Sequence, residues 1–452
     1  MRKLGLVLLS LVLFAGCAPK DPEQEAEPVS TETSEAVAEE PAIQVNYGTV
    51  QRTAQELAET IASSDTEACA SFFSPASETP HESSDLAELF SITEGKTLSV
   101  TECDPYVRDG FAGAVILFEA EDQSEYECMF TLNGSLEIMK LGFAKRDVQV
   151  TAEDGEDWTE TIIHAGNAPK ITGVLCVPNE EEEAPIAVLM AEDISDPWNA
   201  SGSNAELRKD LAHALAEHGI ASVRFNGRLY EDPLLAEIFG YDLNLVRDED
   251  FASIVHTLEQ YPVNAGKIIY IGHGAAGALG YSSVYHHFEI TGGLVLINAP
   301  FEEDGVHLFA RAMWMEEETA DEVSDLLADD EREVTEAAGF PLSYWAQWND
   351  SGALRYTRYV SIPILIQQAE EDEIVRLKED YDDWKSQKGS NVTMKSYEDL
   401  GHDLRNEDGV FEDLIAEDIA DWLDGVDINK KKTDKDKDTA ASTTGTSTGR
   451  KT

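Results

Sequence analysis

The spacing of hydrophobic positions along this chain changes near residue 150, and the change predicts two folded parts. Between residues 43 and 150, one stretch with apolar residues three and four positions apart predicts a helix, and four short apolar runs after it predict strands. From residue 151 onward, apolar runs alternate regularly with amphipathic stretches. Strands that alternate with helices are typical of a mostly parallel sheet with helices on both faces.

The part from 43 to 150 is predicted to be a small α+β domain. Its helix is expected between Ala54 and Phe73, and Asn133-Gly134 predicts a hairpin turn between the last two strands. It holds no group of reactive side chains, so docking, ligand sensing and a spacer role all stay open. The predicted strands are Thr97–Cys103, Gly113–Ala120, Tyr126–Leu132 and Leu136–Phe143.

The part from 151 to 428 is predicted to be an α/β domain with a doubly wound, mostly parallel sheet. A helical insertion, about Phe301 to Trp348, is rich in Met and Trp. It is expected either to cover a pocket as a lid or to pack its aromatic residues onto the sheet. The predicted strands are Ile171–Pro178, Ile186–Ala191, Ala221–Phe225, Lys267–Gly272, Gly293–Ile297, Pro363–Ala369 and Val392–Tyr397. The predicted helices are Ala205–His218, Asp248–Gln260, Ala276–Phe288, Lys378–Gln387 and Glu412–Trp422.

The N-terminus carries an export signal. Arg2 and Lys3 precede an apolar run, Leu4 to Phe14, that is too short to span a bilayer. The following Ala15-Gly16-Cys17 resembles the lipobox of bacterial lipoproteins, although Phe14 stands where leucine is usual. The resemblance implies that residues 1–17 are a signal peptide, cleaved before Cys17, and that lipid on the Cys17 sulfur anchors the chain to the extracytoplasmic face of the cell membrane. An ordinary secretory signal is the alternative.

Two segments have the composition of solvated chain. Residues 18–42 consist mainly of Pro, Glu, Ser, Thr and Ala, and predict a disordered acidic linker. Residues 429–452 carry Lys430-Lys431-Lys432 and a Ser/Thr/Gly run, and predict a disordered tail.

Composition excludes some classes of function. The chain has 452 residues, of which 42% are hydrophobic, so it can bury a sizeable core. Its 33 Lys and Arg against 89 Asp and Glu give a net charge of −56, which argues against nucleic acid as a partner. Most of this charge falls on residues 151–428, which have 17 basic and 59 acidic side chains.

Export would place four further cysteines in a setting where disulfides can form. They permit three complete pairings, and four free thiols are an equally open alternative. Their spacing fits no zinc site, and we expect no metal. These residues are Cys69, Cys103, Cys128 and Cys176.

One strand–turn–helix, residues 268–278, carries the candidate chemistry. Gly272, Gly274 and Gly277 satisfy the dinucleotide fingerprint G-x-G-x-x-G, in which pyrophosphate lies at the helix N-terminus. That fingerprint also requires an acidic residue at the end of the next strand, and this strand ends instead at Asn298. A dinucleotide-binding protein therefore stays only as an alternative, and no cofactor is expected.

The same turn resembles the nucleophile elbow of α/β-hydrolases, G-x-S-x-G, with Gly274 where the serine belongs. Asp372 follows one late strand and His402 the next, in the chain order of that family's acid and histidine. The strand order over residues 170–425 fits as well. The whole chain resembles bacterial esterase-type α/β-hydrolases that carry an N-terminal domain of unknown function. The resemblance implies an esterase-type fold, with Asp372 and His402 as acid and histidine.

The departures from this family predict lost chemistry. Glycine has no side chain to attack an ester, yet it adopts the strained backbone of the elbow without cost. The oxyanion hole would use the N–H of Ala275 and one from the loop at Glu192, where Glu192 and Asp193 would repel a developing oxyanion. We therefore expect an inactive or very weak hydrolase that binds a small-molecule or protein ligand. An active esterase with an unorthodox nucleophile is the alternative.

Nearby polar side chains have simpler interpretations. Ser195 is the one conceivable substitute nucleophile, since Ser282 and Ser283 lie more than a helical turn beyond the elbow. Asp372 and His402 could persist only as a structural pair. His273 is expected to pack in the core or to bond backbone.

Overall fold

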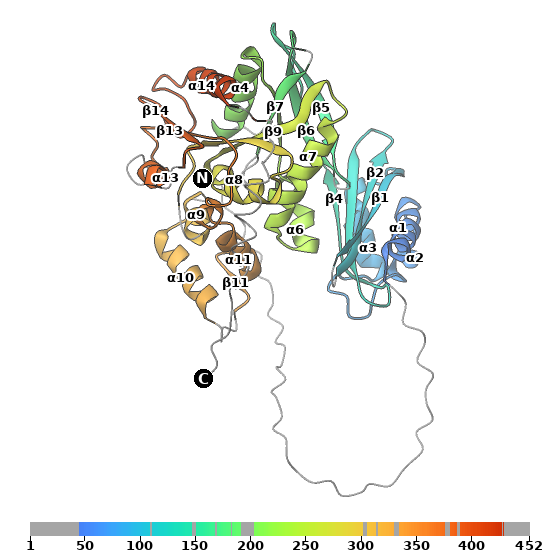
Figure 1. Cartoon of the computed structure of the whole chain (residues 1–452). Helices are drawn as coiled ribbons and strands as arrows, with labels where there is room; N and C mark the ends of the chain where they lie inside the picture. Colours follow the sequence, from blue (N-terminus) through green and yellow to red (C-terminus); the bar gives the residue numbers. More distant parts are fainter. Residues whose placement is uncertain are drawn as a thin grey trace, which may run out of the picture. The chain divides into compact units, whose positions relative to one another are not determined.

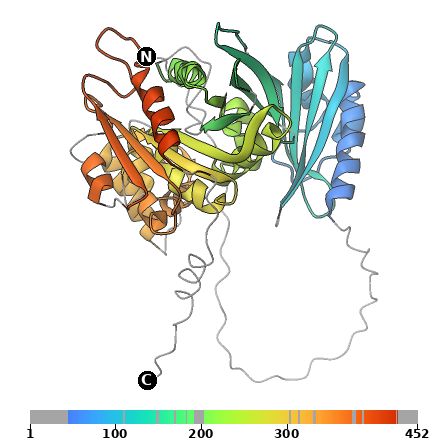
Figure 2. The ribbon, with the colours of Figure 1, turned by 45° about the horizontal axis from the view of Figure 1, so that its top comes forward.

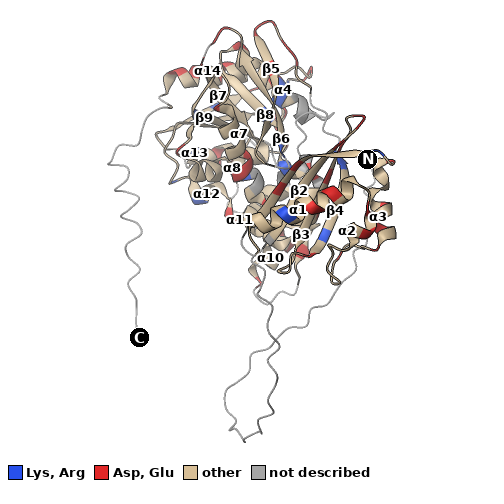
Figure 3. Ribbon diagram, turned by 90° about the vertical axis from the view of Figure 1, so that its right-hand side faces the viewer, with Lys and Arg blue, Asp and Glu red and all other residues tan. Residues whose placement is uncertain are grey.

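The computed structural model describes residues 45–108, 111–146, 151–167, 170–181, 183–190, 203–301, 305–312, 315–329, 334–375, 380–386, 389–426 and 428. The signal peptide, the acidic linker and the basic tail predicted from the sequence lie outside these ranges. The described residues all belong to one compact unit, which contains a four-stranded sheet and an eight-stranded sheet (Figure 1). Acidic positions are spread over helices and loops around both sheets (Figure 3).

The smaller sheet is antiparallel and has the order β1-β2-β3-β4. Helix α1 (Tyr47–Ala62) covers one face of it (Figure 2) with a buried apolar stripe at helical spacing. The single helix predicted here is wrong: Ser64 has φ +57°, which ends α1, and the Asp65 carboxylate caps a second helix. The strands are β1 (Leu98–Arg108), β2 (Phe111–Ala120), β3 (Glu125–Leu132) and β4 (Ile138–Arg146), and the other helices are α2 (Thr66–Ala70) and α3 (Ser83–Leu89).

The larger sheet has the order β14-β13-β10-β9-β7-β8-β6-β5. The six strands from β14 to β8 are parallel, whereas β6 and β5 join at one edge as antiparallel strands. Strand β5 was not predicted, because only Glu160, Ile163 and Ala165 of it are buried and its sequence has no continuous apolar run. The strands are β5 (Trp158–Ala165), β6 (Ile171–Pro178), β7 (Ala184–Leu189), β8 (Ala221–Phe225), β9 (Val263–His273), β10 (Thr291–Ile297), β13 (Ile364–Ala369) and β14 (Val392–Tyr397).

Helices cover both faces of the larger sheet, as the sequence predicts. Helices α4 and α14 pack on one face, and α7, α8 and α13 pack on the other. The inner parallel strands β7, β8, β10 and β13 are buried on both faces, which explains their continuous apolar runs. These helices are α4 (Ser203–Glu217), α7 (Phe251–Leu258), α8 (Gly274–His286), α13 (Asp382–Ser386) and α14 (Leu414–Gly425); the sequence did not predict the short helices α5 (Arg228–Glu231), α6 (Pro233–Phe239) and α12 (Ala353–Tyr356), nor the π-helical turn Leu245–Asp250.

The insertion consists of α9 (Gly305–Ala312), α10 (Glu317–Ala328), the two-stranded β11 (Glu336–Ala337) and β12 (Phe340–Pro341), and α11 (Leu342–Asp350). Its aromatic side chains form a buried cluster with the first turns of α8. The cluster therefore packs the insertion against the helix that begins at the elbow. The aromatic members are Phe309, Phe340, Tyr344, Trp345 and Trp348.

The four cysteines of the folded part are free thiols. Cys103 and Cys128 both pair with Ile116 from opposite sides, so they lie two strands apart, at roughly 10 Å, beyond the reach of a disulfide. Burial raises the pKa of the Cys69 and Cys176 thiols to about 12. No helix within the described ranges is long and apolar enough to cross a membrane.

Candidate functional site

The elbow predicted from the sequence forms at the end of β9. The strand ends at His273, and α8 begins at Gly274, which has φ +55°. This is the left-handed region, which glycine enters freely and other residues enter at a cost of roughly 1–2 kcal/mol. The backbone at the nucleophile position thus takes the strained turn of an elbow, but without a side chain.

The other two glycines of the turn have a packing role. A Cβ on Gly272 would lie 2.5 Å from the Ala276 carbonyl oxygen, and one on Gly277 would lie 2.7 Å from the Ala299 Cβ. Glycine is therefore required wherever α8 passes this close to β9 and to the end of β10. The G-x-G-x-x-G pattern is explained by this contact, without a bound pyrophosphate.

The structure brings Asp372 and His402 together. The Nδ1–H of His402 donates to Asp372 Oδ2 at 2.8 Å, and Asp372 Oδ1 accepts two backbone N–H groups, from Ile374 and Val375, at 2.8 Å each. The Asp372 side chain is fully buried, while that of His402 is 16% exposed. No hydrogen-bond partner of His402 Nε2 occurs within the described residues. We call this pair the Asp372–His402 dyad; it is oriented as a general base would be.

Two buried side chains hold the histidine loop by its backbone. The Nε2–H of His273 donates to the His402 carbonyl oxygen at 2.7 Å, so His273 bonds backbone, one of its two expected roles. Asn298 Nδ2 donates to the same oxygen at 2.9 Å, and Asn298 Oδ1 accepts from the Ala369 N–H at 2.7 Å. Asn298 thus ties the ends of β10 and β13 to the histidine loop. The sequence gives one signal for this residue, a lone amide at the end of a buried apolar strand.

Asn298→Ala is expected to destabilise the protein by about 2 kcal/mol, because it leaves the buried Ala369 N–H without a partner. Urea unfolding monitored by tryptophan fluorescence measures the change. Asn264→Ala is the matched control, since Asn264 is exposed near the start of β9 and its side chain accepts from the Gly266 N–H at 3.3 Å, so its loss is expected to cost less than about 0.5 kcal/mol. Equal losses for the two variants would contradict the role given to Asn298.

Some of the other predicted site residues lie within the described residues, and the rest lie outside them. Ala275 is buried in the first turn of α8, where it contacts the aromatic cluster of the insertion. Ser282 and Ser283 are fully buried, so the structure offers neither as a nucleophile. The sequence places Glu192, Asp193 and Ser195 on the facing loop, and this loop lies outside the described residues. The predicted oxyanion hole and the pocket beneath the insertion therefore stay predictions.

A buried ion pair lies on the α4 face of the sheet. Glu160 Oε1 accepts from Arg224 at 2.7 Å and lies 2.7 Å from His213 Nε2. Glu160, Cys176 and His213 come within 4.8 Å of one another, a spacing that would fit a metal ion. Burial alone would raise the pKa of the Glu160 carboxyl group, but the hydrogen bonds with His213 and Arg224 outweigh it and lower the pKa to about 2, so the carboxylate already has its partners. We interpret this group as structural.

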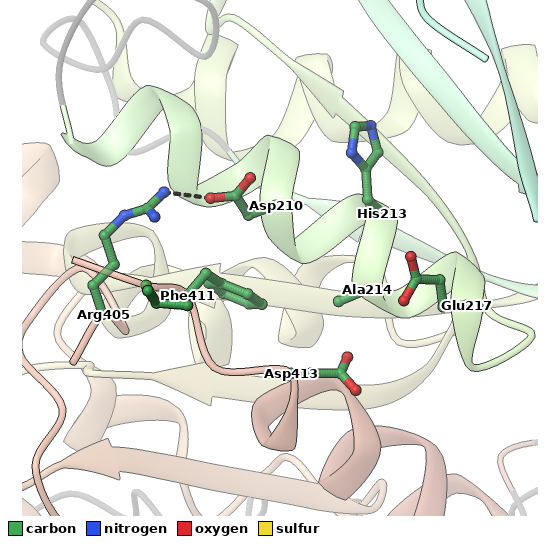
Figure 4. Close-up of a pocket in the computed structure, with 8 residues that line it drawn as sticks. Asp210, His213, Ala214, Glu217, Arg405, Phe411 and Asp413 are labelled. Atoms are coloured by element: carbon green, nitrogen blue, oxygen red, sulfur yellow. Dashed lines mark hydrogen bonds and ion pairs between the residues drawn. The ribbon is translucent and has the colours of Figure 1, made fainter. Parts of the chain in front are cut away.

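His213 also lines a groove between α4 and the segment before α14. Carboxylates of Asp210, Glu217 and Asp413 face the groove, and Arg405 pairs with Asp210 across it (Figure 4). The groove lies on the α4–α14 face, whereas the dyad follows β13 and β14. It is separate from the elbow. On the opposite face, His286 and His287 lie 3.3 and 3.5 Å from Asp248.

The sheet order, the elbow and the Asp372–His402 dyad together define the α/β-hydrolase fold. Solved structures with this fold resemble the chain at low identity. Est1E from Butyrivibrio proteoclasticus is 14% identical and has a TM-score of 0.42, covering 58% of this chain and 97% of its own. The esterase domain of a Rhodothermus marinus protein is 17% identical, with a TM-score of 0.39 and coverages of 58% and 97%.

A mouse protein described as alpha/beta hydrolase domain-containing protein 10 is 16% identical, with a TM-score of 0.39, and covers 59% of this chain and all of its own. No family model matches the sequence, and no curated protein matches it either. The class is therefore defined by the fold and the site, and the activity has to be argued from the residues.

Proposed function

We propose that this chain is a membrane-anchored, extracytoplasmic α/β-hydrolase-fold protein that has lost serine-hydrolase chemistry and acts by binding a small-molecule or protein ligand at the old site. One observation carries the proposal: Gly274 adopts the elbow conformation at φ +55° beside an intact Asp372–His402 dyad. A general base without a nucleophile cannot form an acyl-enzyme. The lipid anchor is inferred from the sequence motif at Cys17. The carboxylates of Glu192 and Asp193 add a second obstacle to ester hydrolysis.

The intact dyad favours a role in ligand binding over a purely structural role. His402 Nε2 is free of protein partners within the described residues, and the His402 side chain is partly exposed. Asp372, His273 and Asn298 fix the ring and the loop that carries it. A fixed nitrogen of this kind offers a hydrogen bond to a ligand hydroxyl or carbonyl group.

The test is the reactivity of the purified native chain. We expect no labelling by a fluorophosphonate probe and no turnover of short acyl nitrophenyl esters beyond that of a Gly274→Ala variant. The second candidate function is an active esterase with an unorthodox nucleophile, and the intact dyad is the observation that favours it. Strong labelling of the native chain that disappears in His402→Ala would establish that candidate instead. A rise in melting temperature on addition of NAD or FAD would support the dinucleotide-binding alternative instead.

A further inference from the structure

The segment from 226 to 243 contacts both the antiparallel sheet and the insertion. Its helix α6 packs against β3 and β4 through an apolar cluster that includes Leu234. Two glycines of the sheet make room for it: a Cβ on Gly142 would lie 2.2 Å from Leu234 Cδ1, and one on Gly113 would lie 2.8 Å from Phe239 Cε1. The antiparallel sheet and helix α6 therefore have complementary surfaces; we call this interface the α6 contact.

The same contact buries an excess of acidic groups. On the sheet side, Glu127 of β3 pairs with Arg146 of β4 at 3.3 Å. On the segment side, Arg228 pairs with Asp250 at 3.0 Å, and its backbone N–H donates to the same carboxylate at 2.9 Å. A third carboxylate, Asp232, is 1% exposed. Three buried acids thus share two guanidinium groups.

Asp232 faces Glu127, an acidic partner. Glu127 is the strongest hydrogen-bonding neighbour of the Asp232 carboxyl group, ahead of the Leu235 N–H, which acts on the same group. Two ionised carboxylates are both acceptors, so this contact requires one proton between them. With that proton the five groups are neutral, and without it they carry one uncompensated buried charge.

We propose that the α6 contact is proton-linked: Glu127 and Asp232 share one proton when α6 lies on the sheet, and release of that proton loosens α6. The inference is independent of the chemistry at Gly274. Burial raises the pKa of Asp232, and burial raises the pKa of Asp250 to about 6 despite Arg228 beside it.

Loosening of α6 would also disturb the contacts between this segment and the insertion. Tyr241, two residues beyond α6, contacts Phe340 and Tyr344 with ring centroids 5.3 and 5.4 Å apart. The Leu243 N–H donates to Gln347 Oε1 of α11 at 2.6 Å. A shift of α6 would therefore displace Tyr241 and Leu243 and alter the aromatic cluster that packs the insertion onto α8. The contact is a candidate regulatory device for the site at the elbow.

The direction of the pH effect follows from the raised pKa. In the open state the two carboxyl groups are solvated and titrate near their ordinary values, about 4. Between that pH and the higher pKa of the closed pair, the closed state holds one more proton. Closure is therefore favoured at low pH and weakens by up to about tenfold per pH unit as the pH rises through this window.

Hydrogen–deuterium exchange of the full chain between pH 4.5 and 8 tests the proposal. Exchange rates are converted to protection factors, so that the intrinsic pH dependence of amide exchange is removed. In the native chain, amides of α6 and α11 are expected to lose at least tenfold protection with rising pH, while amides of β9 and β10 keep theirs. Asp232→Asn supplies a permanent hydrogen-bond donor to Glu127 and is expected to abolish the loss.

Two further variants make the test decisive. Glu125→Gln is the matched control: Glu125 also approaches Arg146, at 3.7 Å, but is 56% exposed, and the pH dependence is expected to survive. Asp250→Asn shows whether the pH dependence comes from Asp232 or from Asp250, the other buried acid of the segment. Flat protection in the native chain overturns the proposal, and so does a pH dependence that persists in Asp232→Asn but vanishes in Asp250→Asn. Protection of β9 and β10 shows in each case that the variant has folded.

Discussion

A serine placed at position 274 is expected to react with a fluorophosphonate probe, at a rate at least about 100-fold above that of the native chain. The backbone already has the elbow conformation, with φ +55° at this residue. The Asp372–His402 dyad is already assembled and lacks only a hydroxyl to deprotonate. Intact-mass spectrometry over time gives the rate of labelling.

Two variants control for the effect of the new side chain. Gly274→Ala adds the same Cβ and the same backbone strain, roughly 1–2 kcal/mol, but no hydroxyl, and no labelling is expected. Adding His402→Ala to Gly274→Ser is expected to slow labelling by ~100-fold or more. Ester turnover is expected to stay poor until Glu192 and Asp193 are also replaced. Labelling of the native chain as fast as that of Gly274→Ser would contradict the proposed loss of the nucleophile.

Glu160→Gln is expected to destabilise the protein by about 3–5 kcal/mol, the usual cost of breaking a buried ion pair by removing one partner. Arg224 is 1% exposed and would be left as an uncompensated buried charge. Urea unfolding at neutral pH measures the loss. Glu153→Gln is the matched control, because Glu153 pairs with Lys209 at 2.7 Å but is 54% exposed, and its loss is expected to cost less than about 1 kcal/mol.

The same residue predicts a pH dependence. The partners of Glu160 lower its pKa to about 2, below the ordinary value near 4. Its stabilising contribution is therefore complete above that ordinary value and is lost as the pH falls from about 4 toward 2. The difference in unfolding free energy between the native chain and Glu160→Gln should shrink over this range. A constant difference down to pH 2 would contradict the assigned role.

The sequence predicts the parallel part of the fold well, for a physical reason. The inner parallel strands are buried on both faces and appear as continuous apolar runs, and β8 has the predicted bounds, as do the edge strand β14 and the antiparallel β6. The dyad was also predictable, since Asp372 and His402 each follow a predicted strand. The edge strand β5 was missed because its solvent-facing residues interrupt the apolar pattern.

What the sequence did not reveal depends on contacts between distant segments. Asn298 bonds residues 71 and 104 positions away. The role of Gly142 becomes visible only when Leu234 lies against it. Helix α6, at seven residues, is too short for a periodic pattern to be recognised. Apart from the lone amide at Asn298, these features have no local signature, because their importance comes from a partner that is distant in the sequence.

The left-handed glycine at position 274 has a consequence for how this protein could change over generations. An elbow that needed serine for its shape would have collapsed when the serine was absent. The close approach of Gly272 and Gly277 to their neighbours fixes the turn on either side of position 274, so a hydroxyl or thiol can be placed there on an elbow that is already formed. One substitution at position 274 therefore makes the site a scaffold for a new nucleophile at a backbone cost of roughly 1–2 kcal/mol, while ester turnover also requires changes at Glu192 and Asp193.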